Sequence, residues 1–509
     1  SAPSYSFRGR WHVDRQNSFI LHETGLEGLF ELSRLAKTPL QRAARMSTGS
    51  LISAMQLEVA LREGYLIPWR KATVEEPKTA EELLVIDKGG LVYQPRPGLY
   101  GNVGEIDFSS MYPTLMEKGN LSPETVNCPC CAPAPDVPEA GYHTCKRRLG
   151  LVPKTIGPLL AKRAAYKARM KREGASSFLR EVFDRRQTAI KWLLVTCFGY
   201  LGYKNARFGK IEAHESTTAL GREKLLRAKE VAEERGYTVL HALTDSLWVA
   251  REQASEADYE RLAGEVARAT GIPASLEGVY RWLVFAPSRE SPKAGVPNRF
   301  FGLFTSGKTK VRGIELRRSD TPPFLRRAQE EMLEVLYGAR DPDEYLALAP
   351  RVLEVLEGYL AALREGRVDV RELALARRLS QDPLRYEKAS TTAIAAQELL
   401  ALGVRLHAGE RVRLVLTDSR APFPGDRAKA LALWDGSRGY DAGWYEAELL
   451  RAAASLLFPA GLDFEALRAR FPSQTPSPST SAGPCPSFRS AYGQNQLCCG
   501  CLCPREENG

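Results

Sequence analysis

Residues 103–114 read Val-Gly-Glu-Ile-Asp-Phe-Ser-Ser-Met-Tyr-Pro-Thr, a short apolar segment that runs into a carboxylate, Asp107. A second apolar segment, residues 237–243, leads into Asp245, and a third apolar segment follows it. Segments of this kind, bounded by turn residues, predict β-strands. Two carboxylates held together on one sheet would suit Mg²⁺, which prefers carboxylate and phosphate oxygens. The spacing is weak evidence by itself, because an Asp in a turn is usually only a turn residue.

Three motifs in order give these acids a context. The stretch Asp107-Phe-Ser-Ser-Met-Tyr-Pro-Thr114 resembles motif A of the family B DNA polymerases. The stretch Lys191-Trp-Leu-Leu-Val-Thr-Cys-Phe-Gly-Tyr200 resembles motif B, and His241-Ala-Leu-Thr-Asp-Ser246 stands where motif C is expected. Met46-Ser-Thr-Gly-Ser50 resembles the stretch before the palm, and Arg312-Gly-Ile-Glu-Leu-Arg-Arg-Ser-Asp320 resembles the entry to the thumb. The resemblance points to the divergent prokaryotic (archaeal or bacterial) branch of the family.

The resemblance implies an α+β, multidomain, right-hand polymerase with an antiparallel palm sheet, a helical fingers hairpin and a helical thumb. The expected domains, in chain order, are a remnant of the N-terminal exonuclease region (1–45), the first part of the palm (46–150), the fingers (151–205), the second part of the palm (206–296), the thumb (297–470) and a disordered tail that contains cysteines (471–509).

Apolar periodicity predicts the helices of this outline. Residues 20–70 are expected to form helices that are interrupted at Pro39 and Gly49. A helix that begins at Pro158 and a second from about Ser177 to Phe198 would form an antiparallel hairpin. Residues 321–470 are expected to be mostly helical.

The resemblance assigns roles to the two acids and to the residues around them. Asp107 and Asp245 would hold two Mg²⁺ ions, for which Mn²⁺ is a substitute, together with the backbone carbonyl of Phe108. Two such ions about 3.5–4 Å apart activate an attacking hydroxyl and stabilise the leaving oxygen in phosphoryl transfer. Tyr112 would lie under the incoming sugar and exclude a ribose 2′-hydroxyl. The other expected nucleotide contacts are Ser110, Met111, Arg163, Lys167, Lys191 and Val195.

Basic side chains are expected to hold both substrates, deoxynucleoside triphosphates and primer–template DNA. Arg163 and Lys167 share a helix face at i,i+4 spacing, and cations there would neutralise charge that moves onto pyrophosphate. A solvated basic face is the structural alternative. Duplex phosphates would be contacted by Arg312, Arg317, Arg318 and Tyr386. Such contacts position DNA without reading its sequence.

Two departures from the family pattern bear on activity. Leu243 replaces the first Asp of motif C, and motif B has Val195 and Phe198 where Asn and Tyr are usual. Loss of these polar groups suggests a looser or differently shaped pocket, and hence low-fidelity or lesion-tolerant (translesion) synthesis. The alternative function is a catalytically weak polymerase relic that binds DNA or acts as a scaffold in repair.

Proofreading is expected to be absent from this chain. The segment Gly9-Arg-Trp-His-Val-Asp14 resembles a late part of the 3′–5′ exonuclease domain, so the earlier acidic motifs would lie upstream. The last exonuclease motif aligns at best with Phe19 and Glu23, where Tyr and Asp are usual.

Cysteines are clustered, which favours metal ligation over disulfides in a reducing compartment. The first cluster has ligand types and spacing that suit Zn²⁺, while a disulfide of the kind that relatives from hot environments carry, or unligated thiols, are the alternatives. Its members are Cys128, Cys130, Cys131, His143 and Cys145. The second cluster lies in residues 485–503, and an unrelated tail sequence explains it as well as a metal site does.

The composition limits the partners. Lys and Arg number 71 against 61 Asp and Glu, a net charge of +10, which suits a polyanionic partner such as DNA. A merely basic protein is an equal alternative on charge alone. The sequence lacks an apolar run of the roughly 20 residues that span a bilayer and a signal-peptide pattern at its start. A cytoplasmic, nucleoid-associated protein with replication or repair partners and no membrane contact is therefore expected.

Overall fold

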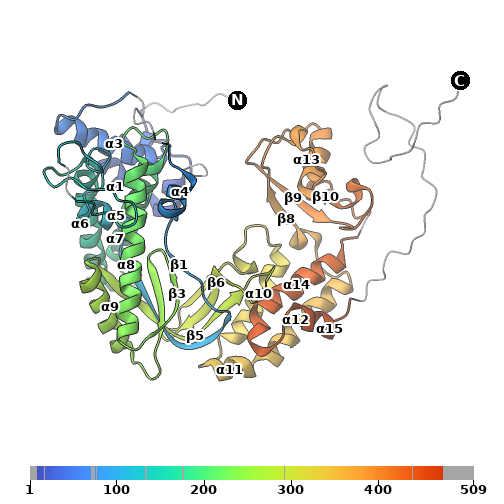
Figure 1. Ribbon diagram of the computed structural model, residues 1–509. Coiled ribbons are helices and arrows are strands. Elements are labelled where there is room, and N and C mark those ends of the chain that lie inside the picture. Colours follow the sequence, from blue (N-terminus) through green and yellow to red (C-terminus); the bar gives the residue numbers. More distant parts are fainter. Residues whose placement is uncertain are drawn as a thin grey trace. The chain divides into compact units, whose positions relative to one another are not determined.

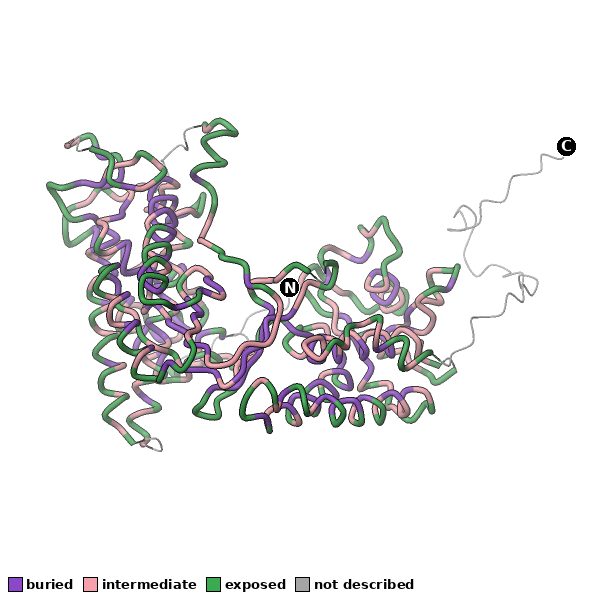
Figure 2. Tube along the Cα trace, turned by 60° about the horizontal axis from the view of Figure 1, so that its bottom comes forward, coloured by how far each residue is buried: buried purple, intermediate pink, exposed green. Residues whose placement is uncertain are grey.

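The computed structural model describes residues 9–15, 18–69, 75, 77–131, 134–174, 177–291, 293–437 and 439–473. Contacts divide the chain into two compact units. Unit 1 consists of Ser1–Pro95 and Asn102–Tyr280, and unit 2 consists of Arg96–Gly101 and Arg281–Gly509. In both units buried and exposed positions alternate along the helices, as the colouring in Figure 2 shows.

Unit 1 combines a helical part with an antiparallel sheet (Figure 1). Its helices are α1 (Phe19–Leu35), α2 (Leu40–Ala43), α3 (Thr48–Arg62), α4 (Ala80–Ile86), α5 (Met111–Lys118), α6 (Leu151–Arg172), α7 (Phe178–Gly202), α8 (Ile211–Glu234) and α9 (Glu256–Thr270). Its strands are β1 (Val92–Tyr93), most of β2 (Gly98–Phe108), β3 (Thr238–Leu243), β4 (Ser246–Ala250) and the first half of β5 (Ala274–Pro287), in the order β1-β3-β4-β2-β5.

Two buried cores support unit 1. Helices α1, α3, α6 and α7 share an apolar core that includes Leu29, Ile52, Ile156 and Leu193. The sheet packs on α8 and α9 through a second core that includes Phe108, Leu247 and Tyr259. The second core fixes β2 and β4, which carry the predicted acids at their ends.

The turn between β3 and β4 consists of two residues. Thr244 adopts a left-handed conformation with φ +54°, and the amide of Asp245 donates to the carbonyl of Leu243 at 2.6 Å. Tight two-residue hairpins need positive φ because their twist then matches that of the strands. The local sequence therefore places Asp245 at the tip of a short, constrained hairpin.

The expected strands around Asp107 and Asp245 are present, but two helix boundaries were predicted wrongly. Gly49 lies inside α3, where a Cβ would come within 2.1 Å of the Tyr200 ring. This glycine therefore provides close packing and does not end a helix. Helix α6 begins at Leu151 and not at Pro158, because upstream side chains accept from its first amides.

Those capping contacts come from the loop between α5 and α6. The Leu151 amide donates to Glu124 Oε1 at 2.6 Å, and the Val152 amide donates to Ser122 Oγ at 3.2 Å. Free N–H groups at a helix start need such partners. Caps that come from a loop about thirty residues away are not visible in a local sequence pattern.

Unit 2 is built around one large core under several helices. Its strands are the second half of β5, β6 (Gly295–Phe304), β7 (Thr309–Arg312), β8 (Leu375–Arg378), β9 (Arg411–Leu416) and β10 (Ala428–Ala430), and its helices are α10 (Pro323–Leu336), α11 (Pro342–Ala347), α12 (Ala349–Arg364), α13 (Thr391–Ala401), α14 (Ala442–Leu457) and α15 (Phe464–Arg470). A separate antiparallel sheet, in the order β10-β9-β8, was missed by the expectation of a mostly helical 321–470. None of the helices among the described residues is long and apolar enough to cross a bilayer.

Candidate active site

A cavity of about 310 Å³ in unit 1 brings together residues from β2, α5, α6, α7 and the β3–β4 turn. All ten residues that were predicted for catalysis, metal binding and nucleotide binding line it. They are Asp107, Phe108, Ser110, Met111, Tyr112, Arg163, Lys167, Lys191, Val195 and Asp245. The roles of these residues remain predictions, but their convergence on one cavity is a structural finding.

Hydrogen bonds hold the two acids beside each other. The Phe108 amide, next to Asp107, donates to the backbone carbonyl of Asp245 at 2.8 Å. The Ser246 hydroxyl, next to Asp245, donates to Asp107 Oδ1 at 2.9 Å. Each acid is therefore tied to the strand that carries the other, although 138 positions separate them in the sequence.

The electrostatic field of the site favours a cation between the two acids. Burial and the nearby charge of Asp245 raise the pKa of Asp107 to about 6, against a smaller opposing effect of the Ser246 hydrogen bond. A carboxylate with a raised pKa next to a second acid is a common property of functional sites. A divalent cation would relieve this repulsion, and carboxylate oxygens are the ligands that Mg²⁺ prefers.

Cations from the α6–α7 hairpin line the other side of the cavity. Arg163 and Lys167 lie one turn apart on α6, and Lys191 extends from α7. Arg163 donates to the Ser110 hydroxyl at 2.5 Å. Burial lowers the pKa values of Arg163 and Lys167, while Asp107 raises both. Crowded, partly desolvated cations of this kind suit a polyanionic ligand such as a triphosphate.

Tyr112 forms one wall of the cavity and packs against Phe198, with ring centroids 4.4 Å apart. Phe198 in turn stacks on His214 at 4.3 Å. Two glycines make room for the Tyr112 ring. A Cβ on Gly90 would come within 2.9 Å of its hydroxyl, and one on Gly221 within 2.8 Å of its ring.

Sequence reasoning missed several residues of this site. Phe198 lines the cavity. Its position in motif B indicated a place near the site, but only the hydroxyl group that a Tyr would have there was considered. Gly90 and Gly221 had no local signal, because their role depends on a ring from another element. Met111 lines the cavity but is only 2% exposed and also belongs to the core that supports the sheet, and its nucleotide contact remains a prediction.

Leu243 lies on the same face of the sheet as Asp107. Leu243 is paired with Ser246, and Ser246 is paired with Asp107, in successive antiparallel strands. Directly opposed residues point to the same face, and neighbouring strands are about 4.8 Å apart. An acid at position 243 would therefore start roughly 10 Å from Asp107, two strands away. Leu243 is not among the residues that line the cavity.

Comparisons with known proteins agree with this geometry. The profile of DNA polymerase family B matches residues 38–266. DNA polymerase 2 of Saccharolobus solfataricus is 32% identical over 333 residues, which are 65% of this chain and 48% of that protein. In sequence and in fold, the chain is similar to the DNA polymerases of family B.

Further relatives support the same family. A DNA polymerase of Archaeoglobus fulgidus is 27% identical over 82% of this chain and 50% of its own length. The structure of the family B DNA polymerase from Pyrobaculum calidifontis is similar with a TM-score of 0.62 and 29% identity, covering 86% of this chain and 54% of that one. The α+β right-hand fold is thus confirmed, and the chain spans about half the length of the relatives it matches.

The arginines predicted to contact duplex DNA lie in unit 2. Arg312, Arg317 and Arg318 are exposed, at the end of β7 and around the 3₁₀ turn η1 (Glu315–Arg317). Arg318 forms an ion pair with Asp320 at 3.2 Å. Among the described residues, no ion pair is recorded for Arg312 or Arg317.

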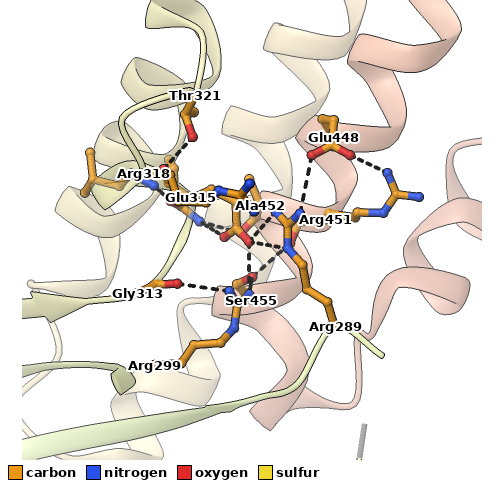
Figure 3. Close-up of polar contacts among 12 residues, drawn as sticks. Arg289, Arg299, Gly313, Glu315, Arg318, Thr321, Glu448, Arg451, Ala452 and Ser455 are labelled. Atoms are coloured by element: carbon orange, nitrogen blue, oxygen red, sulfur yellow. Dashed lines mark hydrogen bonds and ion pairs between the residues drawn. The ribbon is translucent and has the colours of Figure 1, made fainter. Parts of the chain in front are cut away.

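A buried network of charged side chains holds η1, the turn beside these arginines, in place (Figure 3). Glu315 accepts from Arg289 at 2.7 Å and from Arg299 at 3.0 Å. Its other oxygen accepts from Gln329 of α10 at 2.9 Å, and Arg299 also donates to Ser455 of α14 at 2.6 Å. Burial alone would raise the pKa of Glu315, but the two arginines lower it to about 2.

Tyr386, the fourth predicted DNA contact, is half-buried. Its hydroxyl accepts from the Ser380 amide at 2.9 Å, and the ring packs at the edge of the unit 2 core. This arrangement supports a structural role of the ring, and a DNA contact of Tyr386 remains a prediction.

The first cysteine cluster is compact. The sulfurs of four cysteines all lie within 4.8 Å of one another, and they are those of Cys128, Cys130, Cys131 and Cys145. His143, the fifth predicted ligand, is not a member of this group; its Nε2 lies 3.2 Å from the Cys128 carbonyl and 3.9 Å from the Cys128 sulfur. The tail cysteines of residues 485–503 lie outside the described residues.

Proposed function

We propose that this chain catalyses template-directed DNA synthesis, in which a primer 3′-hydroxyl attacks a deoxynucleoside triphosphate on primer–template DNA. The observation that carries the proposal is the single cavity in which two facing acids, three cations and a tyrosine converge. Similarity to family B supports it, as do the names of the relatives, which are DNA polymerases.

The side chains of the cavity suit this reaction. Two Mg²⁺ ions, with Mn²⁺ as a substitute, would be held by Asp107, Asp245 and the Phe108 carbonyl and would supply activation of the hydroxyl and charge stabilisation. Arg163, Lys167 and Lys191 would bind the triphosphate and neutralise the charge that develops on pyrophosphate. Tyr112 would exclude a ribose 2′-hydroxyl.

The finer functional assignments are part of the proposal. Lesion-tolerant synthesis is supported by Val195 and Phe198, which present no polar side chain where the nascent base pair would lie; Val195 is 52% exposed. Lack of proofreading by this chain rests on Phe19 and Glu23 in the last exonuclease motif. We also propose that residues 46–150 and 206–296 act as the palm, 151–205 as the fingers and 297–470 as the thumb.

The second candidate is a DNA-binding relic with little synthesis, acting with repair proteins. Leu243 is the observation that favours it, because the position offers no third carboxylate to the site. The convergence of the other ten predicted residues on one cavity favours the enzyme.

Primer extension with Mg²⁺ and Asp245→Ala tests the proposal. We expect extension by the parent chain and a loss on the order of 10³-fold or more in the variant, which corresponds to about 4 kcal/mol of barrier. Asp87→Asn, which removes an exposed acid at the end of α4, is the control and should retain full activity.

Three outcomes separate the candidates. DNA binding by the parent chain without any extension would establish the relic, and unchanged extension by Asp245→Ala would refute the assignment of the site. A 3′-mismatched primer in the same assay tests proofreading, because its shortening without nucleotides would contradict the predicted lack of exonuclease activity.

A further inference from the structure

We propose that one Zn²⁺ ion is held by four thiolates in the loop between α5 and α6, those of Cys128, Cys130, Cys131 and Cys145. This site goes beyond the proposed synthesis reaction and is structural. The loop that it closes carries the caps of α6 and contacts α8, so that the ion would fix the elements on which the cavity is built.

The sulfur geometry fits one tetrahedral ion. Neighbouring Sγ–Sγ distances are 3.2 Å for Cys128–Cys131, 3.5 Å for Cys130–Cys145 and 3.9 Å for Cys131–Cys145. Four thiolates around Zn²⁺ at about 2.3 Å should be roughly 3.8 Å apart. The spacing is too narrow to enclose a polynuclear iron–sulfur cluster.

The sulfurs form one centre, not two pairs. Cys130 is close to Cys128, at 3.5 Å, as well as to Cys145, and all four thiols are free of disulfides. Without an ion, four thiols this close together could offer one another only weak S–H hydrogen bonds. Tetrahedral S₄ coordination satisfies them together and is typical of structural zinc.

Backbone amides support the sulfurs. The N–H groups of Arg147 and Arg148 are directed at Cys145, and that of Lys146 at Cys131. Hydrogen bonds to ligand atoms orient the ligands of metal sites and offset thiolate charge. His143 lies beside the cluster, with its Nε2 3.2 Å from the Cys128 carbonyl and 3.9 Å from the Cys128 sulfur.

The loop is tied to the start of α6. Asn120 donates to the carbonyls of Cys145 and Arg148 at 2.9 and 2.8 Å, and it accepts from the Gly150 amide at 2.8 Å. Gly150 is the N-cap of α6. An ion that fixes Cys145 therefore also fixes the first turn of the helix that carries Arg163 and Lys167.

The same loop is tied to α8. Tyr142 donates to Glu215 at 2.9 Å, and Glu139 pairs with Arg222 at 2.7 Å. Arg222 follows Gly221, the glycine that makes room for Tyr112. The loop thus connects the nucleotide-binding helix with the helix behind the Tyr112 wall.

Metal analysis of the full-length chain tests the proposal. The background should carry Ser in place of the five tail cysteines, so that only the described thiols can bind metal. We expect about one zinc and no iron per chain, and release of protons on zinc binding. Replacement of zinc by Co²⁺ should give the visible absorption of tetrahedral thiolate coordination. Chelation should lower the midpoint of thermal unfolding.

Two variants make the test specific. Cys145→Ser should lose the zinc, and its unfolding midpoint should no longer respond to chelator. Cys197→Ala, which changes a buried thiol in the α7 core outside the cluster, should keep one zinc per chain. The Co²⁺ spectrum of the unsubstituted cluster keeps the test decisive if Cys145→Ser does not fold.

Several outcomes would overturn the proposal. These are four freely reactive thiols without metal, a disulfide between any two of them in unreduced protein, iron in place of zinc, or zinc that remains in Cys145→Ser. Because metal content is measured without DNA or nucleotide, failure of this site is distinguishable from failure of the synthesis proposal.

Discussion

Leu243 is the residue at which the chain departs most from its family motif, and its position limits the effect of that departure. Leu243 is separated from Asp107 by Ser246 of the intervening strand. Asp245, in contrast, is tied directly to the neighbour of Asp107 by a backbone hydrogen bond. Loss of an acid at position 243 therefore weakens the field around the cavity without removing either facing carboxylate.

Leu243→Asp should consequently strengthen Mg²⁺ binding. A negative charge roughly 10 Å from Asp107, at an effective dielectric constant of about 20, attracts a positive charge there by on the order of 1–2 kcal/mol. We expect the Mg²⁺ concentration for half-maximal primer extension to fall by about tenfold, while Leu243→Asn, the uncharged control, should leave it near the parent value. A metal dependence shared by all three proteins would contradict this account.

Tyr112 should determine sugar selectivity, since it forms a wall of the cavity and is supported from behind by Phe198. Tyr112→Ala would open the space for a 2′-hydroxyl. Removal of such a steric contact is worth about 1–3 kcal/mol, so the preference for deoxynucleotides should fall by about 10- to 100-fold. Competition between ribo- and deoxynucleotides measures this ratio, and Tyr112→Phe, which keeps the ring, should retain it.

At the scale of elements, Glu315 links η1, β6 and α10, and Arg299 extends the link to α14. Removal of one partner of a buried ion pair commonly costs about 3–5 kcal/mol, because the remaining charges stay buried. Glu315→Gln should therefore lower the free energy of unfolding by about that amount. Glu448→Gln, at the solvent-accessible edge of the network, should cost less than about 1 kcal/mol. Urea unfolding compares the two.

The same network predicts a pH dependence. The folded pKa of Glu315, about 2, is below the ordinary value of 4.5, so its charged form is stabilised by folding. This contribution is complete above pH 4.5 and is lost as the pH falls toward 2. The difference in unfolding free energy between the parent and Glu315→Gln should shrink over that interval. A constant difference would show that the charge of Glu315 does not contribute to stability.

Elements that local chemistry defines could be predicted from the sequence, and elements that depend on distant contacts could not. The β3–β4 hairpin with Asp245 follows from its apolar strands and turn residues. The start of α6 depends on Ser122 and Glu124 in a preceding loop. In the three-stranded sheet of unit 2, β8 and β10 are short segments of Arg- and Ala-rich sequence that favours helix, whereas β9, Arg-Val-Arg-Leu-Val-Leu, has an alternating strand pattern that was overlooked.

The cavity itself was predictable because motifs A, B and C mark its residues. The motifs do not show which side chains pack behind the cavity residues. The glycines at 90 and 221 and the ring of Phe198 act through Tyr112, and Met111 faces the core although it lies within motif A.

At the scale of the molecule, a net charge of +10 should make DNA affinity strongly dependent on salt. Each phosphate contact contributes about 0.9 to the slope of log affinity against log salt. Arg312→Ala and Arg317→Ala should each reduce that slope by about one, with little change in sequence preference. Arg318→Ala should reduce it less, because Arg318 already pairs with Asp320. Fluorescence anisotropy titrations over a range of salt measure the slopes.

The hydrogen bond from the Phe108 amide to the Asp245 carbonyl affects how the active site is lost when the protein unfolds. It joins the end of β2 to the β3–β4 turn, and its donor, Phe108, belongs to the buried sheet core. Opening that bond requires β2 and β4 to separate, which is a cooperative event and not fraying of a loop. Protection of the Phe108 amide from hydrogen exchange should therefore match that of the sheet core, and gentle heating should inactivate the acids as a pair, in one step with the loss of the sheet.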